Sequence, residues 1–323
     1  MHPKVLLSED INQHGKDLLT GKAEIIIAPD TSEATAMNMV RDVTGIILRA
    51  TTKINAAIIG NAPKLKIIAR TGVGVDNVDV AAASEKGIFV CNFPGMNNIT
   101  VAEHTLAMIM ALSKQVVHMH NSVKAGNWNE RFSEQQMEVG GKTLGIIGMG
   151  QIGYMVAKMS HYGLGMKILA YDPYTRSKIK DDFIIFADNL SDLFKEADYI
   201  SVHVPGTPET KGIVNNEMLV LMKQTAYLIN TSRGATIDEP ALLEVLSSKK
   251  IRGAALDVFW QEPLPKNSPF NSLDNVILSP HCAGSTWESN VRIAIGAAQA
   301  VLDVIEGRHP DPQYVYNKEV LKR

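Results

Sequence analysis

Three polar side chains in the last third of the chain could carry out chemistry together. Arg233 stands in N-T-S-R-G, Glu262 in D-V-F-W-Q-E-P and His281 in S-P-H-C-A-G-S-T. Arginine can hold a carboxylate through two parallel hydrogen bonds and polarise a neighbouring carbonyl group. Histidine can give a proton to a developing alkoxide, and a carboxylate bonded to its other ring nitrogen fixes the tautomer. The set suits the reduction of a carbonyl compound or the reverse oxidation of an alcohol.

Each of these residues also has an ordinary structural alternative. Arg233 could cap a surface turn, Glu262 could be a turn carboxylate, and His281 could be a hydrogen-bonded core residue. His281 could also bind a metal or form a thiol–imidazole pair with Cys282, but that cysteine is most simply a small apolar residue. Cys91 and Cys282 form no C-x-x-C pair and cannot supply four zinc ligands. We therefore expect no metal site.

A glycine-rich turn predicts a dinucleotide site. G-M-G-Q-I-G (148–153) follows the apolar run T-L-G-I-I and precedes a helical segment. Gly148 allows the tight turn, Gly150 lets the backbone approach a pyrophosphate, and Gly153 lets helix and strand pack closely. Free N–H groups at the start of the helix then face the phosphate charge.

An acidic residue at the end of the next expected strand refines this prediction. Asp172 can accept hydrogen bonds from the ribose hydroxyls of an adenosine, and its charge would repel a 2′-phosphate. The expected cofactor is therefore NAD rather than NADP.

The framework for these residues is predicted by strand patterns that alternate with helical segments. Apolar β-branched runs in the first hundred residues predict strands at 5–8, 24–28, 45–49, 65–70 and 88–92. Later runs predict strands at 143–148, 167–172, 199–204, 226–231, 253–258 and 275–279. Long helices are expected over 100–124 and over 287–307, the second ending at a glycine. The alternation predicts an α/β fold with two parallel sheets, in which the tail returns to the first domain.

The expected strands also explain how the polar residues could meet. Arg233, Glu262 and His281 each follow a predicted strand of the second sheet. In open α/β sheets, ligands bind beyond the carboxyl ends of the strands. As a set beside a dinucleotide loop, the three residues indicate a site.

The composition limits the class of protein. At 323 residues, two domains are expected. The chain is 45% hydrophobic and 20% charged with a net charge of −2, so neither nucleic acid nor an anionic membrane is favoured as a partner. The N-terminus turns acidic too soon for a signal peptide, and no apolar run reaches the length of a membrane span. With only two cysteines, a reducing cytoplasm is the expected location.

The ordered series of motifs resembles the D-isomer-specific 2-hydroxyacid dehydrogenase family, and its pattern is most similar to the D-3-phosphoglycerate dehydrogenase-like members. The motifs are G-M-G-Q-I-G…Y-D-P, N-T-S-R-G-A-T-I-D-E, A-A-L-D-V-F-W-Q-E-P and S-P-H-C-A-G-S-T, preceded by A-R-T-G-V-G-V-D-N-V-D and N-F-P-G-M-N-N-I-T-V-A-E. The resemblance implies two doubly wound parallel-sheet domains. A discontinuous, flavodoxin-like substrate domain would comprise 1–98 and 288–323, and a Rossmann NAD-binding domain would comprise 99–287. It also leads us to expect no C-terminal regulatory domain in a chain of this length.

The resemblance assigns roles to single residues. His281 would be the general acid/base, Glu262 its partner and Arg233 the substrate anchor, in a hydride transfer between NAD(H) and a D-2-hydroxyacid/2-oxoacid pair. Backbone N–H groups of Val73 and Gly74 would bind the substrate carboxylate. The implied cofactor contacts are Gly148, Gly150, Gln151, Ile152, Gly153, Asp172, Val101, Val204, Thr231 and Asp257. The resemblance further implies a homodimer.

Three arginines bear on the choice of substrate. Arg49 and Arg70 stand at predicted strand ends, and Arg131 lies in W-N-E-R-F, near a basic segment of the phosphoglycerate-oxidising members. Three cations exceed what a small carboxylate needs, which favours 3-phosphoglycerate/3-phosphohydroxypyruvate and a place in serine biosynthesis. The alternative is an unphosphorylated acid such as hydroxypyruvate or glyoxylate, with the arginines in salt bridges or solvated.

Two departures from the family pattern bear on affinity and specificity. Gln151 stands where many members carry arginine or lysine, which removes a cation beside the pyrophosphate. Cys282 and Ala283 replace the L-G of the H-L-G-A pattern and alter the expected substrate wall.

Two other classes of function stay open at this point. Some relatives serve as nucleotide-sensing scaffolds, and a hydrolase can use bound NAD as a transient oxidant. The presence of Arg233, Glu262 and His281 together argues against a purely scaffolding role, and net turnover of NADH would argue against the hydrolase.

Overall fold

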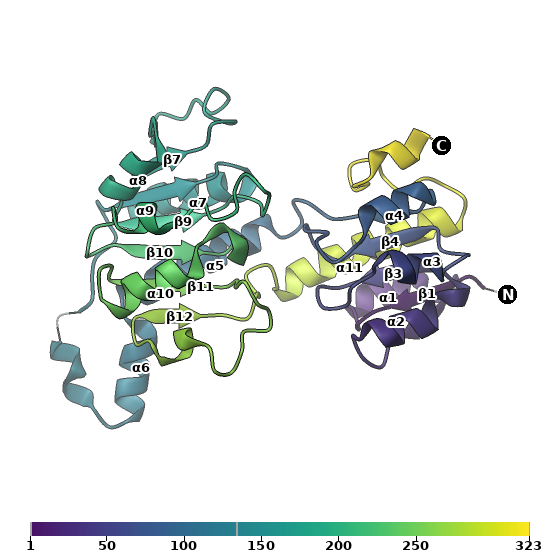
Figure 1. The fold of residues 1–323 in the computed structure, drawn as a ribbon, viewed down its shortest axis with the longest axis horizontal. Helices are drawn as coiled ribbons and strands as arrows, with labels where there is room; N and C mark the ends of the chain where they lie inside the picture. The colour runs from purple at the N-terminus through teal and green to yellow at the C-terminus, as the bar shows by residue number, and fades with distance from the viewer. Residues whose placement is uncertain (1, 134, 323) are drawn as a thin grey trace. The chain divides into compact units, whose positions relative to one another are not determined.

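Two parallel β-sheets, one in each of two compact units, form the framework of the computed structural model (Figure 1). The structure describes residues 2–133 and 135–322. The first unit comprises residues 1–97 and 285–323, and the second comprises residues 98–284. Neighbouring strands pair in parallel throughout the described residues. The prediction of an α/β fold with two parallel sheets is confirmed.

The first unit holds a five-stranded sheet in the order β2-β1-β3-β4-β5. Its strands are β1 (Lys4–Leu7), β2 (Glu24–Ile27), β3 (Val43–Leu48), β4 (Ile67–Arg70) and β5 (Phe89–Cys91). Its helices are α1 (Gln13–Leu19), α2 (Glu33–Met39), η1 (Val40–Asp42), α3 (Ala56–Gly60), α4 (Val80–Glu85), α11 (Trp287–Ile305) and η5 (Lys318–Lys322).

Both faces of this sheet are buried. Side chains alternate along a strand, so Leu6 packs in one hydrophobic cluster and its neighbour Leu7 packs in the other. On the face of Leu7, α11 contacts α1, β3 and β4. The helix begins at Trp287 because Thr286 forms a capping box with Ser289, in which each side chain accepts a backbone N–H of the other.

The second unit holds a seven-stranded sheet in the order β12-β11-β10-β9-β6-β7-β8. Its strands are β6 (Thr143–Ile147), β7 (Lys167–Tyr171), β8 (Ile184–Phe186), β9 (Tyr199–Val202), β10 (Tyr227–Asn230), β11 (Gly253–Leu256) and β12 (Val276–Leu278). Its helices are α5 (Asn98–Ser113), α6 (Val116–Lys124), η2 (Trp128–Phe132), α7 (Gln151–Leu164), α8 (Leu190–Glu196), α9 (Asn216–Leu219), η3 (Gly234–Thr236), α10 (Glu239–Ser247) and η4 (Pro269–Ser272).

The direction in which successive strands are added to this sheet reverses between β6 and β9. Strands β6, β7 and β8 run to one edge, and β9 to β12 run to the other, so β6 and β9 are neighbours. Loops that leave the carboxyl ends of these two strands diverge to opposite sides, and ligands bind in the crevice between such loops.

Two details differ from the sequence-based prediction. The helix expected over 100–124 is interrupted at Gln115, which has a left-handed backbone (φ 51°) without being glycine. The Gln115 side chain donates hydrogen bonds to the Leu112 carbonyl and to the Tyr227 hydroxyl, and these tertiary contacts accompany the turn. The short strand β8 was not predicted, because three residues give no clear periodicity.

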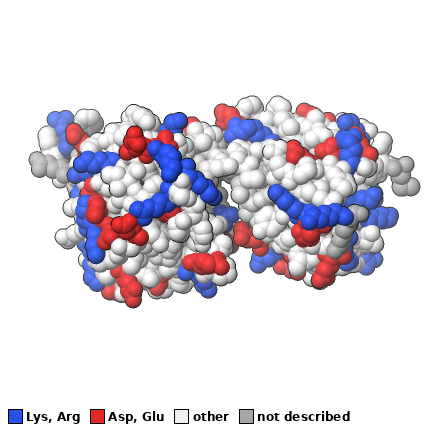
Figure 2. Space-filling model, turned by 90° about the horizontal axis from the view of Figure 1, so that it is seen from above, with Lys and Arg blue, Asp and Glu red and all other residues white. Residues whose placement is uncertain are grey.

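The surface carries both signs of charge. On the face shown in Figure 2, lysine and arginine side chains are interspersed with aspartate and glutamate, and the chain has 32 basic and 34 acidic residues of these types. Among the described residues, no helix has both the length and the apolar character needed to cross a membrane.

Candidate active site

The strand order brings the three residues that are predicted to be catalytic to one edge of the second sheet. Strands β10, β11 and β12 are neighbours. Arg233, Glu262 and His281 follow these three strands in turn, and the carboxyl ends of parallel strands lie at the same edge.

His281 and Glu262 form a hydrogen-bonded pair. Nδ1 of His281 lies 2.6 Å from Oε2 of Glu262, and the other carboxylate oxygen accepts the Phe259 N–H at 2.9 Å. Burial opposes ionisation of Glu262, but the hydrogen bonds from His281 and the Phe259 N–H, with the charge of Arg233, hold its pKa below the ordinary value. An ionised Glu262 keeps the proton of the imidazole on Nδ1, so Nε2 is the ring nitrogen that can exchange a proton with a substrate.

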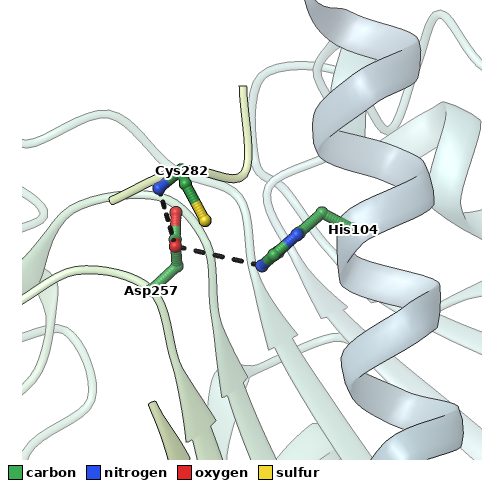
Figure 3. Close-up of side chains that lie close together, drawn as sticks. All are labelled: His104, Asp257 and Cys282. Carbon is green, nitrogen blue, oxygen red and sulfur yellow. Dashed lines mark hydrogen bonds and ion pairs between the residues drawn. The ribbon is translucent and has the colours of Figure 1, made fainter. Parts of the chain in front are cut away.

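The backbone of His281 is held in an unusual conformation. Its φ is 51°, in the left-handed region that non-glycine residues seldom adopt. The His281 N–H donates to the carbonyl of Asp257, and the Asp257 carboxylate accepts the N–H groups of Cys282 and Ala283. The buried Asp257 therefore fixes the turn that carries His281, and Figure 3 shows its bond to the Cys282 N–H.

Arg233 is positioned by its own loop. Its carbonyl accepts a hydrogen bond from Asn230 Nδ2, and its Nη1 donates to the Ser232 carbonyl. A Cβ atom built on Gly206 would lie 3.2 Å from Cγ of Arg233, so the loop after β9 leaves room for the arginine stem. The guanidinium also lies near enough to Glu262 to lower the pKa of that carboxyl.

The glycine loop has the geometry that its motif predicts. Gly148 has a φ of +93°, and a Cβ atom there would lie 2.8 Å from Val204. A Cβ atom on Gly153 would lie 2.1 Å from the Gly148 carbonyl oxygen, so only glycine allows α7 to pack so close to the turn. Gly150 faces open space and is the N-cap of α7, where a phosphate could approach the backbone.

Asp172 ties the glycine loop to the loop that follows β7. Its carboxylate accepts the N–H groups of Met149 and Tyr174, both at 2.8 Å, and that of Thr175 at 3.0 Å. A carboxylate can accept about four hydrogen bonds, so one acceptor position is left for a ribose hydroxyl. The sequence predicted only the ribose contact, whereas the structure adds a role in holding the loop.

A pocket of about 480 Å³ lies along this part of the sheet edge. Its lining residues come from the ends of β6 and β7 and from the loops after β6, β7 and β9: Ile147, Gly148, Gly150, Tyr171, Asp172, Pro173, Tyr174, His203, Val204, Pro205, Thr207, Glu209, Thr210 and Ile213. The lining combines apolar side chains with Asp172 and a free helix N-terminus, which suits an adenosine with its phosphates. The donor set and the glycine cradle therefore fit a dinucleotide.

His203 in this pocket is kept neutral. Burial lowers its pKa to about 4, and its Nε2 lies 2.8 Å from the hydroxyl of Ser201. It therefore adds no positive charge to the pocket near neutral pH.

Four more of the predicted cofactor residues lie on α5, on α7 and directly after β10. Val101 is buried in α5, and its carbonyl accepts a hydrogen bond from Thr105, whose hydroxyl also lies 2.9 Å from that of Thr231. Gln151 accepts a hydrogen bond from Asn98, and Ile152 packs against the core of the second unit.

The predicted substrate residues lie in both units. In the first unit, Arg70 ends β4 and Arg49 follows β3, with Leu48 and Arg70 in register. The Arg49 guanidinium donates to the Asp10 carbonyl and that of Arg70 to the Thr71 carbonyl.

The remaining predicted substrate residues are Val73 and Gly74 in the first unit and Arg131 in the second. Val73 is exposed, and its carbonyl accepts a hydrogen bond from Asn92, which fixes the loop that it shares with Gly74. Arg131 belongs to η2 of the second unit, where its guanidinium lies 4.5 Å from the centre of the Phe132 ring.

The sequence-based prediction did not include Glu239, a second carboxylate near the pair formed by His281 and Glu262. Glu239 accepts the Trp260 N–H, the amide next to the one that Glu262 accepts. Burial raises the pKa of Glu239, and the charge of Glu262 adds to this effect. Glu239 stands in the motif N-T-S-R-G-A-T-I-D-E, so its position in that motif was the available signal.

Comparison with known proteins agrees with this geometry. Residues 106–283 match the D-isomer specific 2-hydroxyacid dehydrogenase, NAD binding domain. The chain is 45% identical over 304 residues to a D-3-phosphoglycerate dehydrogenase of Synechocystis sp., an alignment that covers 94% of this chain and 54% of that protein. The chain thus spans about half the length of this relative.

A relative of similar length and a solved structure extend the comparison. The chain is 37% identical over 328 residues to a glyoxylate reductase of Korarchaeum cryptofilum, covering 100% of this chain and 98% of that protein. The crystal structure of the TT0316 protein from Thermus thermophilus superposes with a TM-score of 0.88 at 35% identity and covers 95% of this chain and 98% of that one. The chain belongs to the D-isomer specific 2-hydroxyacid dehydrogenase family of NAD-dependent oxidoreductases, and its second unit carries the family's NAD-binding domain.

Proposed function

We propose that the chain transfers a hydride between NAD(H) and a D-2-hydroxyacid/2-oxoacid pair. The observation that carries this proposal is the hydrogen-bonded pair of His281 and Glu262 on the same sheet edge as the glycine loop. Arg233 on the neighbouring strand end supplies the cation that a substrate carboxylate needs.

The three residues divide the work of the reaction. NADH, when bound, would supply a hydride for the C2 carbonyl carbon of the oxoacid. His281 gives its Nε2 proton to the oxygen that becomes the alcohol, and Glu262 stabilises the protonated imidazole through Nδ1. Arg233 binds the carboxylate next to C2. The backbone N–H groups of Val73 and Gly74, in the first unit, are proposed substrate contacts. In the oxidative direction the proton returns to His281.

The second unit, 98–284, is the cofactor domain in this proposal, and the first unit is the substrate domain. NAD is the preferred cofactor because the charge of Asp172 lies in the pocket where the 2′-phosphate of NADP would be repelled. The ten cofactor contacts implied by the sequence keep that role in the proposal, including Gln151, Thr231 and Asp257.

The preferred substrate pair is 3-phosphoglycerate and 3-phosphohydroxypyruvate, as part of serine biosynthesis. Arg70 ends β4 and Arg49 follows the neighbouring strand β3, and both would bind the phosphate group. Arg131, in the second unit, is a further proposed phosphate contact. The second candidate is the reduction of glyoxylate or hydroxypyruvate, which the similarity to a glyoxylate reductase of nearly equal length favours.

Substrate preference is tested by following NADH absorbance with purified protein. The acids are 3-phosphohydroxypyruvate, hydroxypyruvate, glyoxylate and 2-oxoisocaproate at matched concentrations. A strong preference for the phosphorylated acid, lost in Arg49→Ala and Arg70→Ala, supports the first candidate. Turnover of only unphosphorylated acids keeps the hydride transfer and rejects the phosphate site. No turnover of any acid contradicts the proposed activity.

We further propose a homodimer formed through the segment 116–132. Helix α6 buries none of its residues, and the segment exposes Val116, Val117, Val123, Trp128 and Phe132. Figure 1 shows α6 extending away from the sheet of the second unit. A short helix without a buried face gains its stability from packing, and a second copy of the chain would supply it.

The dimer is tested by the mass in solution measured by light scattering. Trp128→Glu with Phe132→Glu should convert the dimer to a monomer. Ile185→Glu, which changes an exposed apolar residue elsewhere in the second unit, is the matched control. A wild-type monomer would contradict the proposal.

A reducing, cytoplasmic location completes the proposal. Cys91 and Cys282 are both free thiols in the structure. Free thiols persist where glutathione and thioredoxin keep the compartment reducing.

A further inference from the structure

Three metal-binding side chains from separate elements converge beside the turn that carries His281. His104 comes from α5, Asp257 follows β11, and Cys282 follows β12. One ligand atom from each lies within 4.8 Å of the others, and Figure 3 shows the sulfur and the imidazole directed toward the carboxylate. We propose that these three residues form a binding site for a single zinc(II) ion.

The types of donor favour zinc. A thiolate sulfur, an imidazole nitrogen and a carboxylate oxygen are its usual protein ligands, whereas magnesium and calcium prefer oxygen alone. Three protein ligands leave a fourth tetrahedral position for water or another exchangeable ligand. Sequence spacing gave no sign of this set because 153 and 25 residues separate its members.

The surroundings of the Asp257 carboxylate favour the binding of a cation. Its side chain is 1% exposed, and within the described residues its only ion-pair partner is His104, with Nε2 at 3.9 Å from Oδ1. A buried carboxylate without a permanent cation attracts a divalent ion strongly. The N–H groups of Cys282 and Ala283 already orient this carboxylate, and such outer hydrogen bonds are what fix a metal-binding carboxylate in place.

Binding requires a small, local rearrangement. The Ser279 hydroxyl lies 3.2 Å from His104 Nε2 and 2.5 Å from Asp257 Oδ1, between two of the ligand atoms. Rotation of this hydroxyl about χ1 frees Oδ1 for the metal, while the Cys282 N–H bond stays in place. His104 binds as the neutral tautomer with its proton on Nδ1, and the Cys282 thiol loses its proton to solvent. One proton is therefore released for each zinc ion bound, and no redox change occurs.

The test is a zinc titration of the full-length chain, stripped of metal and without nucleotide or substrate. Calorimetry and competition with a chromogenic chelator measure the stoichiometry and the dissociation constant. We expect one zinc ion per chain, and affinity lowered by about tenfold or more in Cys282→Ser and in His104→Gln. Cobalt(II) in place of zinc should give a thiolate-to-cobalt charge-transfer band in the wild type and none in Cys282→Ser.

Two control variants are matched to the two ligands. Cys91→Ala removes the other thiol, which is buried in the first unit. His118→Gln removes an exposed histidine that also lies beside a carboxylate, that of Glu130 at 2.9 Å. Both should bind zinc as the wild type does, and thermal melting of every variant shows that it is folded.

The proposal is overturned if the wild type binds no zinc in the micromolar range, or if Cys282→Ser and His104→Gln bind it as tightly as the wild type. Because the titration needs neither cofactor nor turnover, its result is independent of the proposed dehydrogenase activity.

Discussion

Nδ1 of His281 and Oε2 of Glu262 lie 2.6 Å apart, and the other oxygen of the same carboxylate accepts the Phe259 N–H. Both oxygens of Glu262 are therefore held, and the imidazole has a fixed orientation. The pair has the geometry of an orienting acid and a proton-transferring histidine.

Substitution of either member of this pair should reduce kcat strongly. His281→Ala removes the proton donor and should cost about 10²- to 10⁴-fold. Glu262→Gln keeps the size but not the charge of its side chain, and we expect a loss of roughly 10²-fold or more. The double variant should be little worse than His281→Ala, because the two residues act as a unit. Steady-state kinetics measures all three, with the exposed Glu244→Gln as control. A Glu262→Gln variant within twofold of wild type would refute the role of the pair.

Removal of the Asp172 charge should change the cofactor preference. Asp172→Ser ends the repulsion of a 2′-phosphate, so the ratio of kcat/KM for NADPH to that for NADH should rise by about tenfold or more. The variant also loses the hydrogen bonds to Met149, Tyr174 and Thr175, so NADH should bind more weakly than in wild type. Asp188→Asn is the control, since Asp188 is exposed and pairs only with Arg176 in the ion pairs described. An unchanged ratio would show that Asp172 does not select the cofactor.

His203 should make the folded state sensitive to mild acid. Its pKa is about 4 in the folded chain and about 6.5 when unfolded, so between these values the unfolded chain binds a proton that the folded chain does not. The free energy of unfolding should therefore fall as the pH drops from about 6.5 towards 4. The variant His203→Gln lacks this titrating group. As the pH falls, the free energy of unfolding should therefore decrease more for the wild type than for the variant. Urea unfolding at several pH values measures this, and a wild type whose stability runs parallel to that of His203→Gln would contradict it.

The two thiols should differ in reactivity from ordinary cysteines. Burial raises the pKa of Cys91 to about 12, and the charge of Asp303 adds to this effect. At pH 8 only about one Cys91 in 10⁴ is then a thiolate, the form that reacts. Burial and the charge of Asp257 also raise the pKa of Cys282, which is half-buried. Mass spectrometry after alkylation at pH 8 should find Cys91 unmodified in the folded chain and modified after unfolding, with Cys282 reacting slowly. Rapid labelling of Cys91 would show that its site opens.

Zinc should inhibit the proposed dehydrogenase activity in competition with NADH, since Asp257 is both a proposed zinc ligand and a proposed cofactor contact. The inhibition constant should rise with NADH concentration, and a chelator should restore activity. Cys282→Ser should resist zinc, whereas Cys91→Ala should respond as wild type does. Inhibition that NADH leaves unchanged would mean that zinc and cofactor do not share Asp257.

The parts of the fold that sequence predicted best are those with strong local signals. The short apolar runs that became β3 and β10 are bounded by polar and turn residues, and the strands formed where expected. The break at Gln115 could not be predicted in this way, because a left-handed glutamine depends on contacts with residues such as Tyr227, far away in the chain.

The candidate site shows the same division. The spacing of G-M-G-Q-I-G and the strand ends before Arg233, Glu262 and His281 were sufficient to predict a glycine loop and three polar residues at one sheet edge, because local backbone conformation and strand order place them. Glu239 behind the pair was missed, because its role depends on two consecutive amides in a loop that the sequence does not describe.

The sequence by itself determined the alternation of strands and helices, the glycine turn and the chemical types at the strand ends, since these follow from local periodicity and residue chemistry. Only the tertiary structure decided that His281 lies in a left-handed turn, that Asp257 holds this turn, and that His104 lies beside Cys282. The physical reason is that these relationships join loops and helices far apart in the chain, and only sheet order and packing bring them together.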